Sequence, residues 1–217
     1  MTKREERFIE ACERNDIDYI SSNVTSLKNK LFVDSEGQSP MLICMMNDSF
    51  DAADILIENG FNINSDGNIA PIAGAIKENS TKAIDYLIKN GVDLNLPFDN
   101  TTKTMPIAFS IHKGFKEITN ILINNGADLS IIQRIHITDK EDTIDEWPMI
   151  SIAAQSGNLD LFEKVVKNSD VNLKSKLGLL PFYCLMAVSS DPKHTFQTKA
   201  AKILINEGAK LEHNVED

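Results

Sequence analysis

The stretch Leu122–Ser130, LINNGADLS, recurs along the chain with its order of residue types kept. The related phrases are LIENGFNIN at 56–64, LIKNGVDLN at 87–95 and LINEGAKLE at 204–212. Recurrence at a nearly fixed interval is the sequence signature of a repeat protein, in which each unit is one supersecondary element. The glycine after each apolar segment predicts the end of a helix, because glycine readily adopts the left-handed conformation found there.

A proline lies at a constant distance before the glycine in three of the repeats. The separation is twenty residues in each of the pairs Pro40 and Gly60, Pro71 and Gly91, and Pro106 and Gly126. Two short apolar segments lie between these markers, and a turn residue such as Gly114 separates them. Proline suits the first turn of a helix, since its missing N–H would have no intrahelical partner there. Each unit is therefore predicted to be a helix-turn-helix hairpin.

Two further units follow the pattern with changes, and the N-terminus follows it in part. Met149 takes the proline position of one unit, and Ser169 replaces its glycine. In the last unit Pro181 and Gly208 are 27 residues apart, which lengthens the turn between the helices. The stretch FIEACERNDIDYI at 8–20 matches only the middle of a unit, as expected of a terminal cap. The predicted organisation is one domain, 1–217, with a cap at 1–33 and repeats at 34–66, 67–101, 102–142, 143–175 and 176–217.

These phrases resemble the ankyrin-repeat family, whose unit has about 33 residues, a T-P-L-H-x-A signature and a GADVN-like helix end. The matches include Ser39-Pro40, NGADLS at 125–130 and AAQSGNLDL at 153–161. The resemblance implies an all-α ankyrin-repeat solenoid of helix-turn-helix hairpins, with about five repeats plus an N-terminal capping helix pair. Because other residues replace the signature threonine in three units, we expect weaker hydrogen-bonded ties and more reliance on apolar stacking. The replacements are Ala70, Met105 and Leu180.

The net charge and the lack of long apolar runs limit the kinds of partner that we expect for this protein. The net charge of −10 argues against nucleic acid, whose binding depends on clustered lysine and arginine. The sequence has no apolar run long enough for a signal peptide or a transmembrane helix. We therefore expect a cytoplasmic protein that binds neither nucleic acid nor membrane, while delivery into a host by a route without a signal peptide stays open.

No motif in the sequence predicts catalysis, a cofactor or a metal. The acidic segment DKEDTIDE at 139–146 lacks the glycine and the glutamate that an EF-hand loop requires. Phosphate-binding loops, zinc-protease motifs and nucleophile elbows are missing from the sequence. The cysteines lack the paired spacing of zinc sites and fall near positions that the repeat packs inside. They are Cys12, Cys44 and Cys184. We predict a protein without enzymatic activity, cofactor or metal.

The resemblance also implies where a partner would bind. In this family the fingers between hairpins and the first helices form a concave face, and the residue two places before the proline position is commonly exposed there. That position is occupied by Gln38, Ile69, Thr104, Trp147 and Leu179. Apolar side chains exposed in a column indicate an interaction site, and we expect His112 of a first helix to lie beside them. Trp147 has a second interpretation, in which it folds back over its own enlarged finger.

The enlarged finger adds five carboxylates to this surface. They belong to Asp139, Glu141, Asp142, Asp145 and Glu146. Their charge favours a basic or amphipathic protein partner, anchored near Trp147. We therefore predict a monomeric, non-catalytic protein-protein interaction module. Two alternatives stay open: an inhibitor or immunity-type regulatory subunit of an enzyme, and a small hydrolase with a site assembled in the groove.

Overall fold

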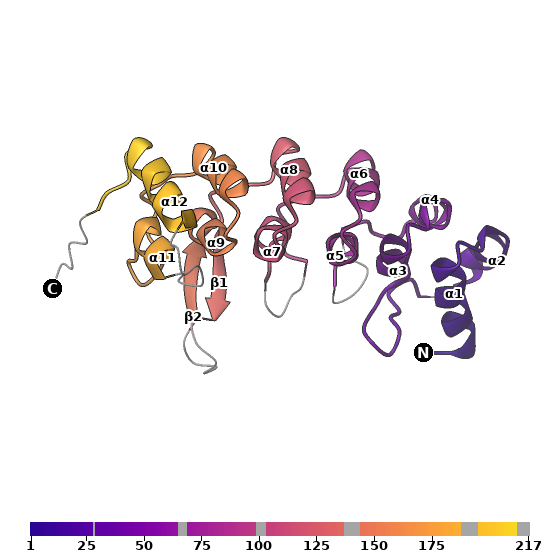
Figure 1. Ribbon diagram of the computed structural model, residues 1–217. Helices are drawn as coiled ribbons and strands as arrows, with labels where there is room; N and C mark the ends of the chain where they lie inside the picture. The colour runs from indigo at the N-terminus through magenta and orange to yellow at the C-terminus, as the bar shows by residue number, and fades with distance from the viewer. Residues whose placement is uncertain (28, 65–68, 99–102, 137–143, 188–194, 212–217) are drawn as a thin grey trace. The chain divides into compact units, whose positions relative to one another are not determined.

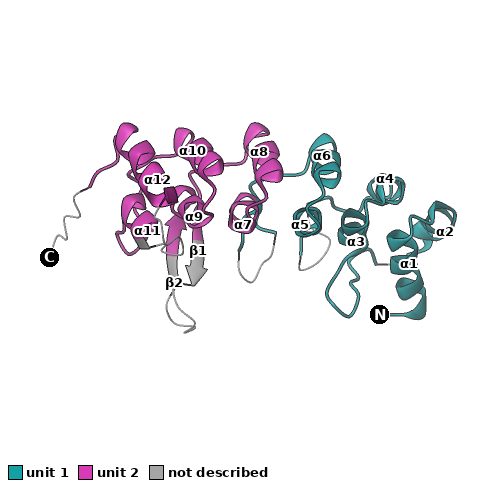
Figure 2. Cartoon of the chain, in the orientation of Figure 1, with its two compact units in different colours: residues 1–106 teal, residues 107–217 magenta. Residues whose placement is uncertain are grey.

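The computed structural model describes the chain except for residues 28, 65–68, 99–102, 137–143, 188–194 and 212–217 (Figure 1). The described residues form two compact units, 1–106 and 107–217, shown in separate colours in Figure 2. Each unit is built from antiparallel helix pairs, so the predicted all-α ankyrin-type fold is confirmed. The division into five repeats with the boundaries given above stays a prediction.

Unit 1 contains three helical hairpins. Its elements are α1 (Lys3–Glu13), α2 (Ile17–Asn23), the short 3-10 helix η1 (Val24–Ser26), α3 (Pro40–Met46), α4 (Phe50–Glu58), α5 (Pro71–Lys77) and α6 (Thr81–Lys89). Helix α3 packs against α1 and α5, and α2 packs against α4. The capping helix pair expected at the N-terminus is α1 and α2.

Unit 2 contains three more hairpins and one feature that the sequence did not predict. Its elements are α7 (Pro106–Lys113), which begins at the last residue of unit 1, α8 (Lys116–Asn124), β1 (Ile132–His136), β2 (Ile144–Pro148), α9 (Met149–Gln155), α10 (Leu159–Lys167), α11 (Pro181–Ala187) and α12 (Thr195–Asn206). Strands β1 and β2 form an antiparallel ribbon that spans the predicted repeat boundary at 142 and 143. Helix α9 packs against α11, and α10 packs against α12.

The first helices begin where the proline pattern predicted. Pro40, Pro71, Pro106 and Pro181 each open a helix, and Met149 opens α9 in the position assigned to it. The residue before the helix caps it only where it carries a hydroxyl. Ser39 Oγ accepts a hydrogen bond from the backbone N–H of Leu42 at 3.2 Å, whereas Ala70 gives α5 no side-chain cap. At the start of α5, where Ala70 replaces the signature threonine, the expected loss of a hydrogen bond is therefore observed.

The second helices end through two cooperating residues. Glycines with positive φ follow them, for example Gly60 at 80° and Gly126 at 91°. An asparagine side chain also closes the last turn by donating to the carbonyl four residues earlier, at 2.8 to 3.0 Å, in Asn59, Asn90, Asn125 and Asn168. This bond adds a second donor to a carbonyl that, for Asn59, Asn90 and Asn125, already accepts the backbone N–H of the same asparagine at 3.1 Å. It also stabilises the α10 end, where Ser169 stands in place of the glycine.

The core of each hairpin depends on one central residue of the second helix. Leu56, Leu87, Leu122 and Leu204 are fully buried. The residues beside them are less enclosed, since Ile57 is half-buried and Ile205 is exposed. Three consecutive residues of a helix point in directions about 100° apart, so they cannot all face one core.

All three cysteines are buried, in agreement with the packing role predicted for them. Cys12 of α1 and Cys44 of α3 meet where these helices pack, and the hydrogen bond between the two thiols, followed by burial, raises the pKa of Cys44 well above its usual value. A raised pKa keeps the Cys44 side chain as a neutral thiol, which is the form that packs in an apolar core.

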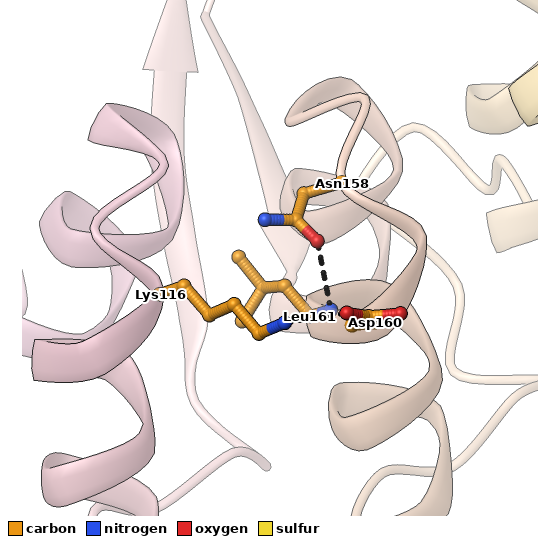
Figure 3. Close-up of polar contacts among 4 residues, drawn as sticks. All are labelled: Lys116, Asn158, Asp160 and Leu161. Carbon is orange, nitrogen blue, oxygen red and sulfur yellow. Dashed lines mark hydrogen bonds and ion pairs between the residues drawn. The ribbon is translucent and has the colours of Figure 1, made fainter.

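In unit 2 the second helices of neighbouring hairpins are joined by polar side chains. Figure 3 shows Lys116 of α8 reaching Asp160 of α10, with which it forms an ion pair. In the same view Asn158 caps α10 by accepting from the backbone N–H of Leu161 at 3.2 Å. One turn further on, Lys164 Nζ donates to Asn124 Oδ1 at 3.1 Å. These bonds lie on the solvent side and link the two hairpins.

Candidate functional site

The ribbon of β1 and β2 projects from the side of unit 2 that carries the first helices (Figure 1). Gln133 lies opposite Trp147, and Ile132 lies opposite Pro148. Successive residues of a strand point to opposite faces, so Gln133 and Trp147 share one face and Ile132 and Glu146 share the other. The first face is packed inside: Trp147 is only 6% exposed.

This burial corrects one sequence-based expectation. Trp147 is not part of an exposed column, because its side chain is buried. In the other fingers the residue two places before the helix start is half-buried, as in Ile69, Thr104 and Leu179. Here the finger has become a ribbon, and its alternation turns the indole toward the core.

A second finger lies along the ribbon. We call Ser175–Leu179 the terminal finger. The backbone N–H of Ser175 donates to the Leu179 carbonyl at 2.9 Å. The backbone N–H of Lys176 donates to the Glu146 carbonyl at 3.0 Å, and Lys176 Nζ lies 3.4 Å from Glu146 Oε1. The terminal finger is therefore hydrogen-bonded to β2, with its apolar residue Leu177 62% exposed.

Fingers in unit 1 are linked in the same manner. The Phe98 carbonyl accepts from the backbone N–H of Ala70 at 2.7 Å, and the Phe98 N–H donates to the Thr104 carbonyl at 3.0 Å. Ile69 and Thr104 are both half-buried at this linkage. Two of the predicted binding residues are thus brought onto adjacent fingers of unit 1, while Trp147 and Leu179 lie on adjacent fingers of unit 2.

The remaining predicted site residues fall into three groups. His112 is exposed on α7, and Leu179 is half-buried in the terminal finger. Glu146 is engaged by Lys176, so its charge is partly compensated within the chain. Asp139, Glu141 and Asp142 lie outside the described residues, as does the side chain of Asp145.

Two exposed apolar residues of the unit 2 fingers were missed by the sequence reasoning. Ile132 is 42% exposed on the outer face of β1, and Leu177 is exposed at the turn of the terminal finger. The exposure of Leu177 could have been predicted from the sequence, because this leucine lies between Lys176 and a turn glycine and belongs to no predicted helix. The exposure of Ile132 could not be predicted from the sequence, because it depends on the pairing of β1 with β2.

Comparison with known proteins agrees with this architecture. Residues 8–98 match the family model described as ankyrin repeats in three copies. Residues 8–98 are therefore ankyrin repeats. The ankyrin repeat protein FPV244 of fowlpox virus is 29% identical over 106 residues, which are 48% of this chain and 14% of the viral protein. Ankyrin repeat and SOCS box protein 6 of Pongo abelii is 26% identical over 137 residues, 63% of this chain and 30% of that protein. The ankyrin-repeat chain thus spans less than a third of either relative.

Solved structures show the same fold at low sequence identity. An ankyrin repeat domain of Acinetobacter baumannii AYE superposes with a TM-score of 0.70 and 20% identity, covering 95% of this chain and all of that one. The ankyrin repeat domain of human ASB11 superposes with a TM-score of 0.64 and 17% identity, covering 94% of this chain and 85% of that one. Ankyrin repeats are modules that bind other proteins through extended surfaces.

Other kinds of site were sought in the described ranges. No group of three His, Cys, Asp or Glu side chains is placed there to hold a metal ion. An open depression on α10 is lined by Asp160, Glu163, Lys164 and Lys167, and Lys167 pairs with Glu163 at 2.9 Å. Small-molecule sites are usually more enclosed and apolar than this. None of the described helices has the length and hydropathy needed to span a membrane.

Proposed function

We propose that the chain is a non-catalytic protein-binding module whose partner lies across the ribbon and the terminal finger of unit 2. The observation that carries the proposal is the pair of exposed apolar side chains, Ile132 and Leu177, on fingers joined by a backbone hydrogen bond. Exposed apolar side chains on linked segments favour an interaction site, and a partner that covers Leu177 gains about 1.5 to 3 kcal/mol from its full burial.

The hydrogen bond between the fingers favours binding in a second way. A surface whose backbone is already fixed loses little conformational entropy when a partner arrives. The ribbon ladder, the Lys176 to Glu146 bond and the turn of the terminal finger all hold the backbone before binding. His112 and Gln155 are exposed on α7 and α9 and supply polar groups at the rim.

The chemistry of the partner follows from this surface and from the net charge. Apolar side chains are needed opposite Ile132 and Leu177, and basic groups are favoured by the net charge of −10. An amphipathic, basic protein segment meets both requirements. A monomeric chain suits this role, because the surface is then available to a different protein.

The test compares a variant that lacks the proposed apolar surface with a control variant changed at another exposed leucine. Native protein is immobilised, bound proteins are identified from the source lysate, and Kd is measured with the purified partner. Ile132→Ser/Leu177→Ser removes the apolar surface, while Leu31→Ser, at a residue 69% exposed in unit 1, is the matched control. We expect at least a tenfold loss of affinity in the double variant and none in the control. Equal affinities for all three proteins would refute the site.

The same measurement separates a recognition module from an enzyme inhibitor. If the partner is an enzyme, its rate is recorded with increasing amounts of each variant. Inhibition that is lost in Ile132→Ser/Leu177→Ser and kept in Leu31→Ser would make the chain a regulatory subunit. A partner that binds without a change in rate would leave it a recognition module.

A further inference from the structure

Three asparagine-glycine pairs occupy equivalent places in the repeats, each directly after a second helix. They are Asn59-Gly60 after α4, Asn90-Gly91 after α6 and Asn125-Gly126 after α8. Asparagine is most reactive before glycine, because glycine has no Cβ to shield its backbone nitrogen from the side-chain amide carbon. We call these three the helix-end pairs.

The reaction available to a helix-end pair is deamidation through a cyclic imide. The backbone nitrogen of the glycine loses its proton and forms a bond to Cγ of the asparagine. The bond between Cγ and Nδ2 breaks, and the amide leaves as ammonia. Water then opens the five-membered ring at either of its two carbonyls, which gives aspartate or isoaspartate. The chain and water are the only reactants, so no oxidant, metal or cofactor is required.

The folded helix end keeps the reacting atoms apart. The glycine N–H donates to the carbonyl three residues earlier, at 2.9 Å in Gly60, 3.0 Å in Gly91 and 3.2 Å in Gly126. The asparagine Nδ2 is held by its own bond to the helix, at 2.8 to 3.0 Å. The ψ angles of the asparagines, 12° to 17°, turn the glycine nitrogen toward the asparagine's own nitrogen and away from Cβ. Because the imide ring contains Cβ, it closes only after the last turn opens.

The rate at each pair therefore depends on how often its helix end opens, and such local openings differ in free energy across a structure. The Asn59 carbonyl accepts a hydrogen bond from Lys30 Nζ, which also lies 5.9 Å from the centre of the Phe61 ring. Ring closure rotates the asparagine about its Cα–C bond and swings this carbonyl, so the bond from Lys30 must break first. Asn59 is also half-buried.

The other two pairs lack this restraint. Asn90 and Asn125 are exposed. Among the hydrogen bonds of the described residues, none reaches the backbone carbonyl of either asparagine. Their helix ends are therefore held by the two bonds that all three pairs share, without a third from another segment.

We propose that Asn90 and Asn125 are sites of spontaneous deamidation, and that Lys30 protects Asn59 from the same reaction. The site is built by the chain alone, and its co-reactant is water. Neither reactive pair belongs to the ribbon or the terminal finger.

Deamidation changes the helix end irreversibly. Aspartate has no Nδ2 donor for the carbonyl four residues earlier, and it places a negative charge where the helix dipole is also negative. Isoaspartate adds one methylene to the main chain, which displaces the glycine whose positive φ ends the helix, 79° in Gly91 and 91° in Gly126. The last turns of α6 and α8 therefore become less stable as the protein ages.

The test measures the reaction at every pair in one sample. The full chain is incubated in neutral buffer at physiological temperature and digested at mildly acidic pH, and each peptide is quantified by mass spectrometry. An isoaspartyl methyltransferase with a labelled methyl donor reports the isoaspartate. We expect Asn90 and Asn125 to react about fivefold faster than Asn59.

Asn168 is an internal control for the role of glycine. Its Nδ2 makes the same bond to the helix at 2.8 Å and it is exposed, but it precedes Ser169. We expect Asn168 to react more slowly than Asn90 and Asn125. An equal rate at Asn168 would show that the asparagine-glycine pairs have no special reactivity.

Two comparisons separate the effect of the fold from that of the local sequence. In guanidinium chloride, which removes the helix ends, the three pairs should react at rates within about twofold of one another, since glycine follows each asparagine. Lys30→Met keeps an unbranched apolar side chain beside Phe61 and removes the donor. It should raise the rate at Asn59 about fivefold and leave Asn90 unchanged. The unchanged rate at Asn90 also shows that unit 1 is still folded in the variant.

Several results would overturn the proposal. Equal rates at the three pairs of the folded chain, or an unchanged rate at Asn59 in Lys30→Met, would remove the protective role of Lys30. A ranking that persists in guanidinium chloride would assign the difference to neighbouring residues. Intact Asn90 and Asn125 in the folded chain, after a time that converts the unfolded chain, would refute both sites.

Discussion

Glu146 and Lys176 are joined twice, once through the main chain at 3.0 Å and once through their side chains at 3.4 Å. The two bonds differ in strength, because an exposed ion pair contributes about 0 to 1 kcal/mol and is screened by salt. Lys176→Ala removes the ion pair and keeps the backbone bond. We expect the free energy of unfolding in urea to fall by less than about 1 kcal/mol at low salt, and by less in high salt. A larger loss would show that the side chains hold the fingers together.

Trp147→Ala should destabilise the protein strongly, because the indole is buried beneath the ribbon. Removal of a buried tryptophan leaves a cavity and costs about 3 to 5 kcal/mol. Urea unfolding followed by circular dichroism measures the change, with Leu177→Ser as a control expected within about 0.5 kcal/mol of the native chain. Native stability of Trp147→Ala would contradict the buried position. Because Trp147→Ala is expected to be destabilised, it is a poor variant for measuring partner binding.

Ala70→Ser should stabilise α5 by supplying the missing cap. Ala70 has the extended backbone of an N-cap, with φ −70° and ψ 146°, close to the φ −83° and ψ 160° of Ser39. A serine hydroxyl at an N-cap is worth about 0.5 to 1 kcal/mol in the free energy of unfolding. Ser39→Ala is the mirror experiment and should cost about as much. Opposite shifts in the two urea midpoints are expected, and a destabilising Ala70→Ser would mean that the buried site has no room for the hydroxyl.

Gly74→Ala should destabilise the protein although alanine favours helices. A Cβ at this position would lie 2.8 Å from Leu42 Cδ1, 2.8 Å from Met46 Cγ and 3.1 Å from the Leu42 carbonyl oxygen. The helix propensity gain of about 1 kcal/mol competes with overpacking that costs about 1 to 3 kcal/mol. We expect a net loss of about 1 kcal/mol in urea unfolding. The cost should shrink in a Leu42→Ala background, and an unchanged cost would point away from the contact with that side chain.

Tyr86→Phe should change both the stability and its dependence on pH. Burial first, and then the hydrogen bond to Asp54, raise the pKa of Tyr86 above its ordinary value. With a raised folded-state pKa, the stabilisation is complete below about pH 10 and is lost as the pH rises further. The variant keeps a ring that stacks on Phe50. Because the hydrogen bond is lost, its free energy of unfolding falls by about 0.5 to 1.5 kcal/mol at neutral pH. Between neutral and alkaline pH its free energy of unfolding declines less than that of the native chain. Parallel pH profiles for both proteins would contradict this assignment.

The helix boundaries could be predicted because single residues determine them. Proline at Pro40 and Pro71 and glycine at Gly60 and Gly91 restrict the backbone locally, so the helix starts and stops followed from the sequence. The asparagine caps were missed although Asn59 and Asn90 directly precede those glycines, since a side-chain bond to a carbonyl four residues back depends on the helix already being formed.

The candidate site could be predicted only in part, because it depends on register and on distant partners. Whether Trp147 faces the core is decided by its pairing with Gln133, and a shift of one residue would reverse it. The compensation of Glu146 comes from Lys176, which is remote in sequence and reaches it only when the terminal finger lies along β2. Ile69 and Thr104 were placed on fingers correctly, since their position follows from the local helix starts.

The ribbon leaves α8 and returns to α9 without disturbing the start of either neighbouring helix pair, and Trp147 fixes its base. The outward-facing residues of β1, such as Ile132, can therefore change while the helical pairs keep their stability. In the proposed function, the residues that contact a partner are then different from those that maintain the fold. Exchange of Ile132 and Leu177, with Trp147 and Gln133 retained, would be the shortest route to a module of new specificity.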